Sequence, residues 1–270
     1  MISEAGSAIE RSAVVDVFGS VADLYDTVRP GYPPEIAGEI VAYHGGTPAS
    51  VVEIGAGTGK ATTALARIGA PLTCIEPDPR MAALLAARHP GVRLHVSTFD
   101  QWSPPAGGVD VLACAMAWHW LDPATRNAHA RRALAPGGTL AVLGHRYDYT
   151  DPGQRAAIRS ALHALDPTVR ERPTDWFHQD IVDHGQFVDV RQEVFRRELP
   201  LDRQRYLDLV RTFGPYLSRS PEQQRAGLTV LGRLVDDFGG TVLLDLRTTL
   251  VLGRAGRRTG HAGRQRSDRA

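Results

Sequence analysis

Several features of membrane, secreted and metal-binding proteins are missing from this sequence of 270 residues. No run of apolar residues approaches the ~20 needed to cross a bilayer. The first residues lack the basic region and apolar core of a signal peptide. The only cysteines, Cys74 and Cys114, lie in predicted buried strands and form no CxxC pair, so we expect neither disulfides nor a metal cluster. These absences predict a cytoplasmic protein that binds no metal.

A strong charge of one sign is also missing. The formal net charge is +1, so the body of the protein has no strong attraction to nucleic acid or acidic membranes. Residues 254–270 differ, because they carry six arginines against one acid and predict a disordered tail. No aromatic residues lie between these arginines to stack on bases. We therefore expect no nucleic-acid partner and no membrane partner.

The most informative segment present is VVEIGAGTG, residues 51–59. It predicts a buried strand that ends in three alternating glycines and leads into a helix over about residues 58–67. Glycine permits a close backbone approach and a positive φ. The start of a helix offers free N–H groups and the positive end of its dipole. We therefore expect a nucleotide-like cofactor at this turn.

Spacing distinguishes three cofactor classes that use such a turn. A phosphate-binding P-loop would need glycine where Ile54 stands and serine or threonine where Ala61 stands. A dinucleotide fingerprint would need a small residue where Lys60, the only lysine, stands. The observed pattern is Glu-x-Gly-x-Gly-x-Gly, with Glu53 near the end of the strand.

This pattern resembles the first motif of class I S-adenosylmethionine (SAM)-dependent methyltransferases. In that family the acid faces the methionine end of the cofactor, which carries a cationic ammonium, whereas NAD offers no such cation. An unpaired acid at the end of an apolar strand is costly, which favours a cationic partner for Glu53. The resemblance implies cofactor contacts from this motif by Glu53, Gly55, Ala56, Gly57 and Gly59.

Further cofactor contacts are expected after the next strands. Glu76, followed by Pro77, ends a second predicted strand, and its two oxygens suit the ribose hydroxyls. NAD enzymes share this acid, so Glu76 alone does not separate the two classes. A third strand over residues 92–97 leads to a segment similar to the one that contacts adenine, with Phe99 and Asp100. The remaining expected contact is Ala115, which follows the fourth strand at residues 110–114.

A narrower resemblance lies in residues 18–33 and in the segment AWHW, residues 117–120. Together they look like the trans-aconitate methyltransferase-like branch of the methyltransferase type 11 group. In that branch the leading helix closes over the cofactor, which implies that Tyr25 and Arg29 lie near the methionine carboxylate. The alternative is that Tyr25 packs in the core and Arg29 lies on the surface. The acceptors of this branch are diverse, so the resemblance does not identify the substrate.

The order of elements predicts an α/β, Rossmann-like class I methyltransferase fold. We expect a mostly parallel seven-stranded sheet with helices on both faces. We expect further helices between the last two strands to form a cap over the acceptor pocket. The expected single domain covers residues 1–253, with lid helices at about 10–44, the cofactor-binding core at about 48–146, and the cap and last strands at about 150–253.

The expected reaction is methyl transfer to a small organic acceptor by in-line displacement, with O-methylation favoured. The protein mainly has to align the reacting atoms, and a base is needed only if the acceptor holds its proton. His119 is the first candidate base and His145 the second. A carboxylate acceptor would need no base, and Arg29 or Arg146 would hold it instead. An aromatic pocket is expected from Trp118, Trp120, Tyr147, Trp176, Phe177 and Tyr216.

Two rival functions remain open at this point. One is a NAD-dependent oxidoreductase, and the other is a non-catalytic SAM-binding regulatory subunit. The sequence leaves the acceptor and the oligomeric state undetermined. It lacks the Asn/Asp-Pro-Pro-Tyr/Phe motif typical of amine methylation on nucleic-acid bases, since Ala115 and Met116 begin the corresponding segment.

Overall fold

The structure, a computed structural model, describes residues 18–165 and 176–256. A seven-stranded sheet has the order β3-β2-β1-β4-β5-β7-β6. The pairs β1–β2, β1–β4, β2–β3 and β4–β5 are parallel, while β7 runs antiparallel to both β5 and β6. The predicted Rossmann-like, mostly parallel sheet is therefore confirmed. The strands are β1 (Val51–Ile54), β2 (Leu72–Ile75), β3 (Arg93–His95), β4 (Val109–Ala115), β5 (Leu134–Tyr149), β6 (Phe187–Asp202) and β7 (Thr241–Ala255).

The centre of the sheet is buried on both faces, because helices pack on each of them, and successive side chains of a strand point into the two opposite apolar clusters. Val51 of β1 and Val111 of β4 belong to one apolar cluster, and Val52 and Leu112 to another. The first cluster includes residues of α3, α4, η1 and α5, and the second includes residues of α6 and α8. These helices are α3 (Glu35–His44), α4 (Thr62–Leu65), η1 (Ala66–Ile68), α5 (Pro79–Arg88), α6 (Arg126–Ala133) and α8 (Trp176–Asp183).

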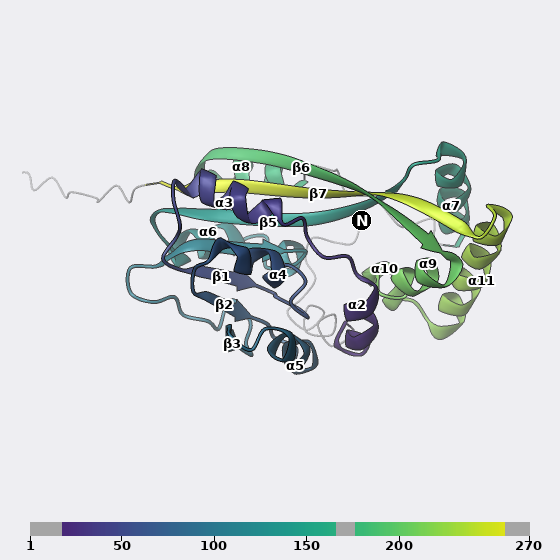
Figure 1. Cartoon of the computed structure of the whole chain (residues 1–270), viewed down its shortest axis with the longest axis horizontal. Coiled ribbons are helices and arrows are strands. Elements are labelled where there is room, and N and C mark those ends of the chain that lie inside the picture. Colours follow the sequence, from purple (N-terminus) through teal and green to yellow (C-terminus); the bar gives the residue numbers. More distant parts are fainter. Residues whose placement is uncertain (1–17, 166–175, 257–270) are drawn as a thin grey trace, which may run out of the picture.

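Strands β5, β6 and β7 continue well beyond the short parallel strands, and further helices gather at their far end (Figure 1). A third apolar cluster forms there, with Ile158, Leu207, Leu231 and Leu244 among its buried members. Helices α9 to α11 lie between β6 and β7 in the chain, as the cap prediction requires. The helices at this end are α7 (Pro152–Leu165), α9 (Arg203–Val210), α10 (Gly214–Leu217) and α11 (Pro221–Asp237).

The lid predicted at about residues 10–44 corresponds in the described part to α2 (Ala22–Val28) and α3. Helix α2 lies beside α9 and α5 and so joins the cap to the cofactor-binding half of the sheet (Figure 1). Residues 10–17 of the predicted first helix and residues 257–270 of the predicted tail lie outside the described part. No helix in the described part is long and apolar enough to cross a membrane.

Three predicted boundaries were wrong. The helix predicted at about 58–67 begins only at Thr62, because the glycine turn continues through Gly59, whose φ is +88°. The segment Pro136-Gly137-Gly138 also predicts a turn between a helix and the fifth strand, but it lies within β5, where the register with β4 shifts. Strand β7 ends at Ala255 and so includes the first two residues of the segment predicted as a tail.

Candidate cofactor-binding site

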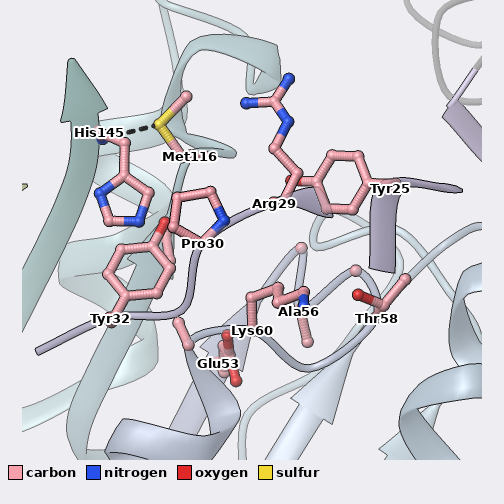
Figure 2. A pocket seen from close by; sticks show the side chains of 14 residues that line it. Tyr25, Arg29, Pro30, Tyr32, Glu53, Ala56, Thr58, Lys60, Met116 and His145 are labelled. Atoms are coloured by element: carbon pink, nitrogen blue, oxygen red, sulfur yellow. Dashed lines mark hydrogen bonds between the residues drawn. The ribbon is translucent and has the colours of Figure 1, made fainter. Parts of the chain in front are cut away.

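A pocket lies where β1 and β4 end side by side, between the glycine turn and the lid (Figure 2). The order of the sheet reverses here, since β2 follows β1 on one side and β4 lies on the other. Open α/β sheets bind their ligands in the crevice at such a switch point. The pocket is lined by Tyr25, Arg29, Pro30, Tyr32, Glu53, Gly55, Ala56, Gly57, Thr58, Lys60, Ala61, Ala115, Met116 and His145.

The three positions of the turn require glycine for different structural reasons. All have positive φ, at +62° for Gly55, +57° for Gly57 and +88° for Gly59. A Cβ on Gly55 would lie 2.5 Å from the Cβ of Ala117, and one on Gly59 would lie 2.9 Å from the His89 ring. A Cβ on Gly57 would meet nothing within 4 Å. Packing inside the protein therefore explains Gly55 and Gly59, and Gly57 is the position that leaves room for a ligand.

Glu53 is fully buried and incompletely hydrogen-bonded. Its Oε2 accepts from the Thr62 hydroxyl at 2.6 Å, while its Oε1 has no hydrogen-bond partner. Burial raises the pKa of this carboxyl to about 8, and the Thr62 hydrogen bond offsets only part of the effect. A buried carboxyl in this state can be ionised by a cationic donor placed beside Oε1. The ammonium of a bound amino-acid moiety would be such a donor.

Glu76 closes the glycine turn from the end of β2. Its Oε2 accepts from the backbone N–H of Gly57 at 2.8 Å, and its Oε1 accepts from that of Asp78 at 2.9 Å. Burial raises the pKa of Glu76, and the two backbone N–H groups oppose that rise. Each oxygen has a second lone pair, so the carboxylate retains capacity for ribose hydroxyls. Asp78, not Glu76, caps α5.

The residues predicted to contact adenine do not line this pocket. Phe99 is buried and packs against Trp102 and His129, and Asp100 is exposed and bonds to His129 Nδ1 at 2.7 Å. Pro77 is likewise absent from the lining. Adenine contacts by these residues therefore stay predictions. The other predicted cofactor residues, Tyr25, Arg29, Glu53, Gly55, Ala56, Gly57 and Ala115, all line the pocket, and Gly59 and Glu76 support its turn.

His119 lies outside the lining of the pocket. It belongs to a short turn, η2 (Trp118–Trp120), and its ring lies 4.3 Å from the Trp120 ring. The turn is held by Asp180 of α8, which accepts from Trp118 Nε1 at 2.8 Å and pairs with buried Arg126. Trp120 contacts Phe18, which contacts Tyr25 of the lid, so this turn borders the lid. The role of His119 as a base stays a prediction.

Several residues that line the pocket were not predicted from the sequence, Lys60 and Met116 among them. Lys60 donates to the backbone oxygen of Asp26, whose carboxylate pairs with Arg88 of α5, so the only lysine ties the lid to the glycine turn. Met116 has a φ of 55°, which is unusual for a residue other than glycine, and its sulfur accepts from the backbone N–H of His145. Met116 directly follows the fourth strand, and this position could have identified it as a pocket residue.

Comparisons with known proteins agree with this geometry. A family model described as a methyltransferase domain matches residues 52–142. The chain is 30% identical over 188 residues to trans-aconitate 2-methyltransferase of Rhizobium meliloti, covering 65% of this chain and 72% of that protein. An uncharacterized methyltransferase of Mycobacterium tuberculosis is 35% identical over 134 residues. That match covers 48% of this chain and only 53%, about half, of the relative.

The fold has a close counterpart among solved structures. A protein from Anaeromyxobacter dehalogenans described as a putative type II methyltransferase superposes with a TM-score of 0.64 at 22% identity, covering 85% of this chain and 97% of that one. Fold and site together define a nucleotide-type cofactor pocket at the switch point of a Rossmann-like sheet. The chain belongs to the class I SAM-dependent methyltransferases. Its cofactor is accordingly SAM, and the unpartnered Oε1 of Glu53 and the open space at Gly57 fit that molecule.

Proposed function

We propose that the protein transfers the methyl group of SAM to a small organic acceptor, with transfer to oxygen favoured. The observation that carries the proposal is the buried, unpartnered Oε1 of Glu53 beside the open position at Gly57. A carboxyl in this position suits a cofactor with a cationic ammonium, and NAD has no ammonium that could pair with it. One relative supports an oxygen acceptor by its name, malonyl-[acyl-carrier protein] O-methyltransferase of Hahella chejuensis, and the name of trans-aconitate 2-methyltransferase supports a small organic acceptor.

The chain's own residues would act by binding and orientation. Glu53 would hold the ammonium, the turn at Gly57 would receive the backbone of the cofactor, and Glu76 would accept from the ribose hydroxyls. When bound, SAM supplies a methyl group already activated by its positively charged sulfur. Because no strong acid or base is needed to activate that group, alignment of the acceptor by the lid and the cap is the main contribution of the protein.

The proposal is tested by calorimetric titration with SAM, followed by incubation of the protein and methyl-tritiated SAM with pools of small metabolites. We expect binding at one site per chain and transfer of label to a small product that mass spectrometry identifies. Hydride transfer from a nicotinamide cofactor would refute the proposal. SAM binding with no labelled product from a broad extract would instead indicate a regulatory subunit.

His119 is the proposed base for an acceptor that must lose a proton. Replacing His119 by alanine should lower turnover by about 100-fold, the usual range for loss of a positioned base, and leave the Kd for SAM unchanged. The turn would keep its shape, because Asp180 holds it through Trp118 and Arg126. The measurement is the pH dependence of kcat for the wild type and the variant. A pH–rate profile that is the same in both proteins would remove His119 from the mechanism.

A further inference from the structure

The two oxygens of the buried Glu53 carboxyl have different surroundings. Oε2 accepts from the hydroxyl of Thr62 at 2.6 Å, and the Sγ of Cys74, a weaker donor, lies 3.8 Å from the same oxygen. Oε1 has no hydrogen-bond partner in the described part of the chain. Two donors therefore converge on one oxygen and none on the other. In the neutral carboxyl the proton accordingly resides on Oε1, because Oε2 is already an acceptor.

Thr62 uses its hydroxyl differently from the threonine beside it. A threonine in a helix commonly donates to the carbonyl oxygen four residues earlier. Thr63 does so, since its hydroxyl donates to the backbone oxygen of Gly59 at 3.4 Å. Thr62 is the first residue of α4 and is fully buried, and its hydroxyl donates to β1 instead. This hydroxyl therefore serves Glu53 and neither its own helix nor the solvent.

The sheet register fixes the carboxyl between two small side chains. Glu53 of β1 pairs with Cys74 of β2 on one side and with Ala113 of β4 on the other. Both neighbours are fully buried, and paired residues carry their side chains on the same face of the sheet. With Thr62 bonded to Oε2 as well, the carboxyl keeps one orientation. Its two oxygens therefore cannot readily exchange places.

The titratable groups that face Glu53 supply no cation. Glu76, at the end of β2, adds a like charge that further raises the pKa of Glu53. Burial raises the pKa of Tyr32, of Cys74 on β2 and of Cys114 on β4, so these three groups stay neutral. Within the described residues, the hydrogen bonds from Thr62 and Cys74 are therefore what favours the ionised form of Glu53, and Thr62 has the larger effect.

We propose that Thr62 is a positioning residue for the cofactor, because it holds Oε2 of Glu53 so that Oε1 alone receives the ammonium of SAM. Glu53 loses its Oε1 proton to the solvent when it pairs with the ammonium, and the carboxylate that results stays bonded to Thr62. Since Thr62 stabilises this ionised form, it also sets the pH range over which SAM binds. This inference rests on the contact between Glu53 and the ammonium in the proposed function.

The test is calorimetric titration of the full chain with SAM between about pH 6 and 8, in buffers of different ionisation enthalpy. Thr62→Val keeps the shape of the side chain and removes the donor, so Glu53 should ionise less readily. SAM should then bind about tenfold more weakly near pH 7. The variant should also release more protons per SAM bound near pH 8 than the wild type, because less of its Glu53 is ionised beforehand. Thr62→Ser keeps the hydroxyl and should restore the affinity to within about threefold of the wild type.

Thr63→Val is the matched control, because Thr63 is the exposed neighbour whose hydroxyl bonds within its own helix. This control should change neither the affinity for SAM nor the proton release. The positioning role would be refuted if Thr62→Val binds SAM as tightly as the wild type, or if it binds more weakly with unchanged proton release. Should the valine variant not fold, Thr62→Ala removes the same donor and gives the same comparison.

Denaturant unfolding without SAM separates this inference from the proposed function. The stability that the neutral carboxyl contributes is lost as the pH rises through its folded-state pKa, about 8 in the wild type. Thr62→Val raises that pKa further, so the stability difference between the variant and the wild type should widen above about pH 8. In a Glu53→Gln background the difference should not depend on pH. If the wild type does not bind SAM, the proposed function is wrong, and a pH-independent difference in unfolding would also refute the action of Thr62 on Glu53.

Discussion

Replacing Glu53 by glutamine is expected to weaken SAM binding by about 100-fold or more, because the variant cannot become the carboxylate that pairs with the ammonium. The buried carboxyl of the wild type has a pKa of about 8, so it is neutral in the cofactor-free protein below that pH. Binding of a cation beside Oε1 favours the ionised form, and the proton must leave. Between about pH 6 and 8, the affinity of the wild type for SAM should therefore rise by up to about tenfold per pH unit.

The same substitution should stabilise the cofactor-free protein in mild alkali. The folded-state pKa of Glu53, about 8, lies above the usual value of 4.5 for a glutamate side chain. The favourable contribution of Glu53 to the free energy of unfolding is therefore fully present below about pH 4.5. It is lost as the pH rises towards and through 8. Because glutamine does not titrate, Glu53→Gln should be more stable than the wild type at pH 8, by several kcal/mol at most, and SAM should stabilise only the wild type.

These expectations are checked by calorimetry in buffers of different ionisation enthalpy and by denaturant unfolding across the pH range. The control is Glu193→Gln, an exposed carboxylate on β6, which should change neither quantity. If SAM binding by the wild type releases no proton and Glu53→Gln binds as tightly, Glu53 does not hold the ammonium.

Replacing Gly57 by valine is expected to abolish SAM binding at accessible concentrations while the fold persists. The added side chain would meet no protein atom within 4 Å of its Cβ, so its main clash would be with a ligand lying on the turn. The φ of +57° costs a β-branched residue about 1–2 kcal/mol, which lowers stability without unfolding the domain.

Gly185→Val is the matched control for this experiment. Gly185 also has a positive φ, +61°, and open space around its Cβ, but it lies between α8 and β6 and does not line the pocket. Both variants should lose similar stability in thermal unfolding, and only Gly57→Val should lose affinity in calorimetry. Equal affinity for SAM in the two variants would contradict the proposed position of the cofactor.

Local residue patterns were sufficient to predict the residues of the glycine turn that line the pocket. The short apolar runs in 51–54 and 110–114 predict buried strands, and the strands form there. Glu53 and the glycines were predicted from neighbouring residues alone, because a strand, a glycine turn and an acid within nine residues already indicate a ligand. The reasons for the separate glycines did need the structure, because Ala117 and His89 come from elsewhere in the chain.

The cap side of the pocket depends on contacts between distant segments. Arg29 reaches Thr212, which is 183 positions away, and His145 meets Thr248, which is 103 positions away. No periodicity or spacing encodes such pairs, so the sequence left Arg29 as a ligand of either the cofactor or a carboxylate acceptor and ranked His119 above His145.

The sequence by itself therefore determined the fold class, the family and the residues of the cofactor turn, because these follow from short-range order along the chain. Only the tertiary structure decided which polar side chains share the cap side of the pocket and which of them lack partners. Burial and hydrogen bonding at that place are set jointly by the lid, β5, β7 and the segment after α9, which meet only when the whole chain has folded.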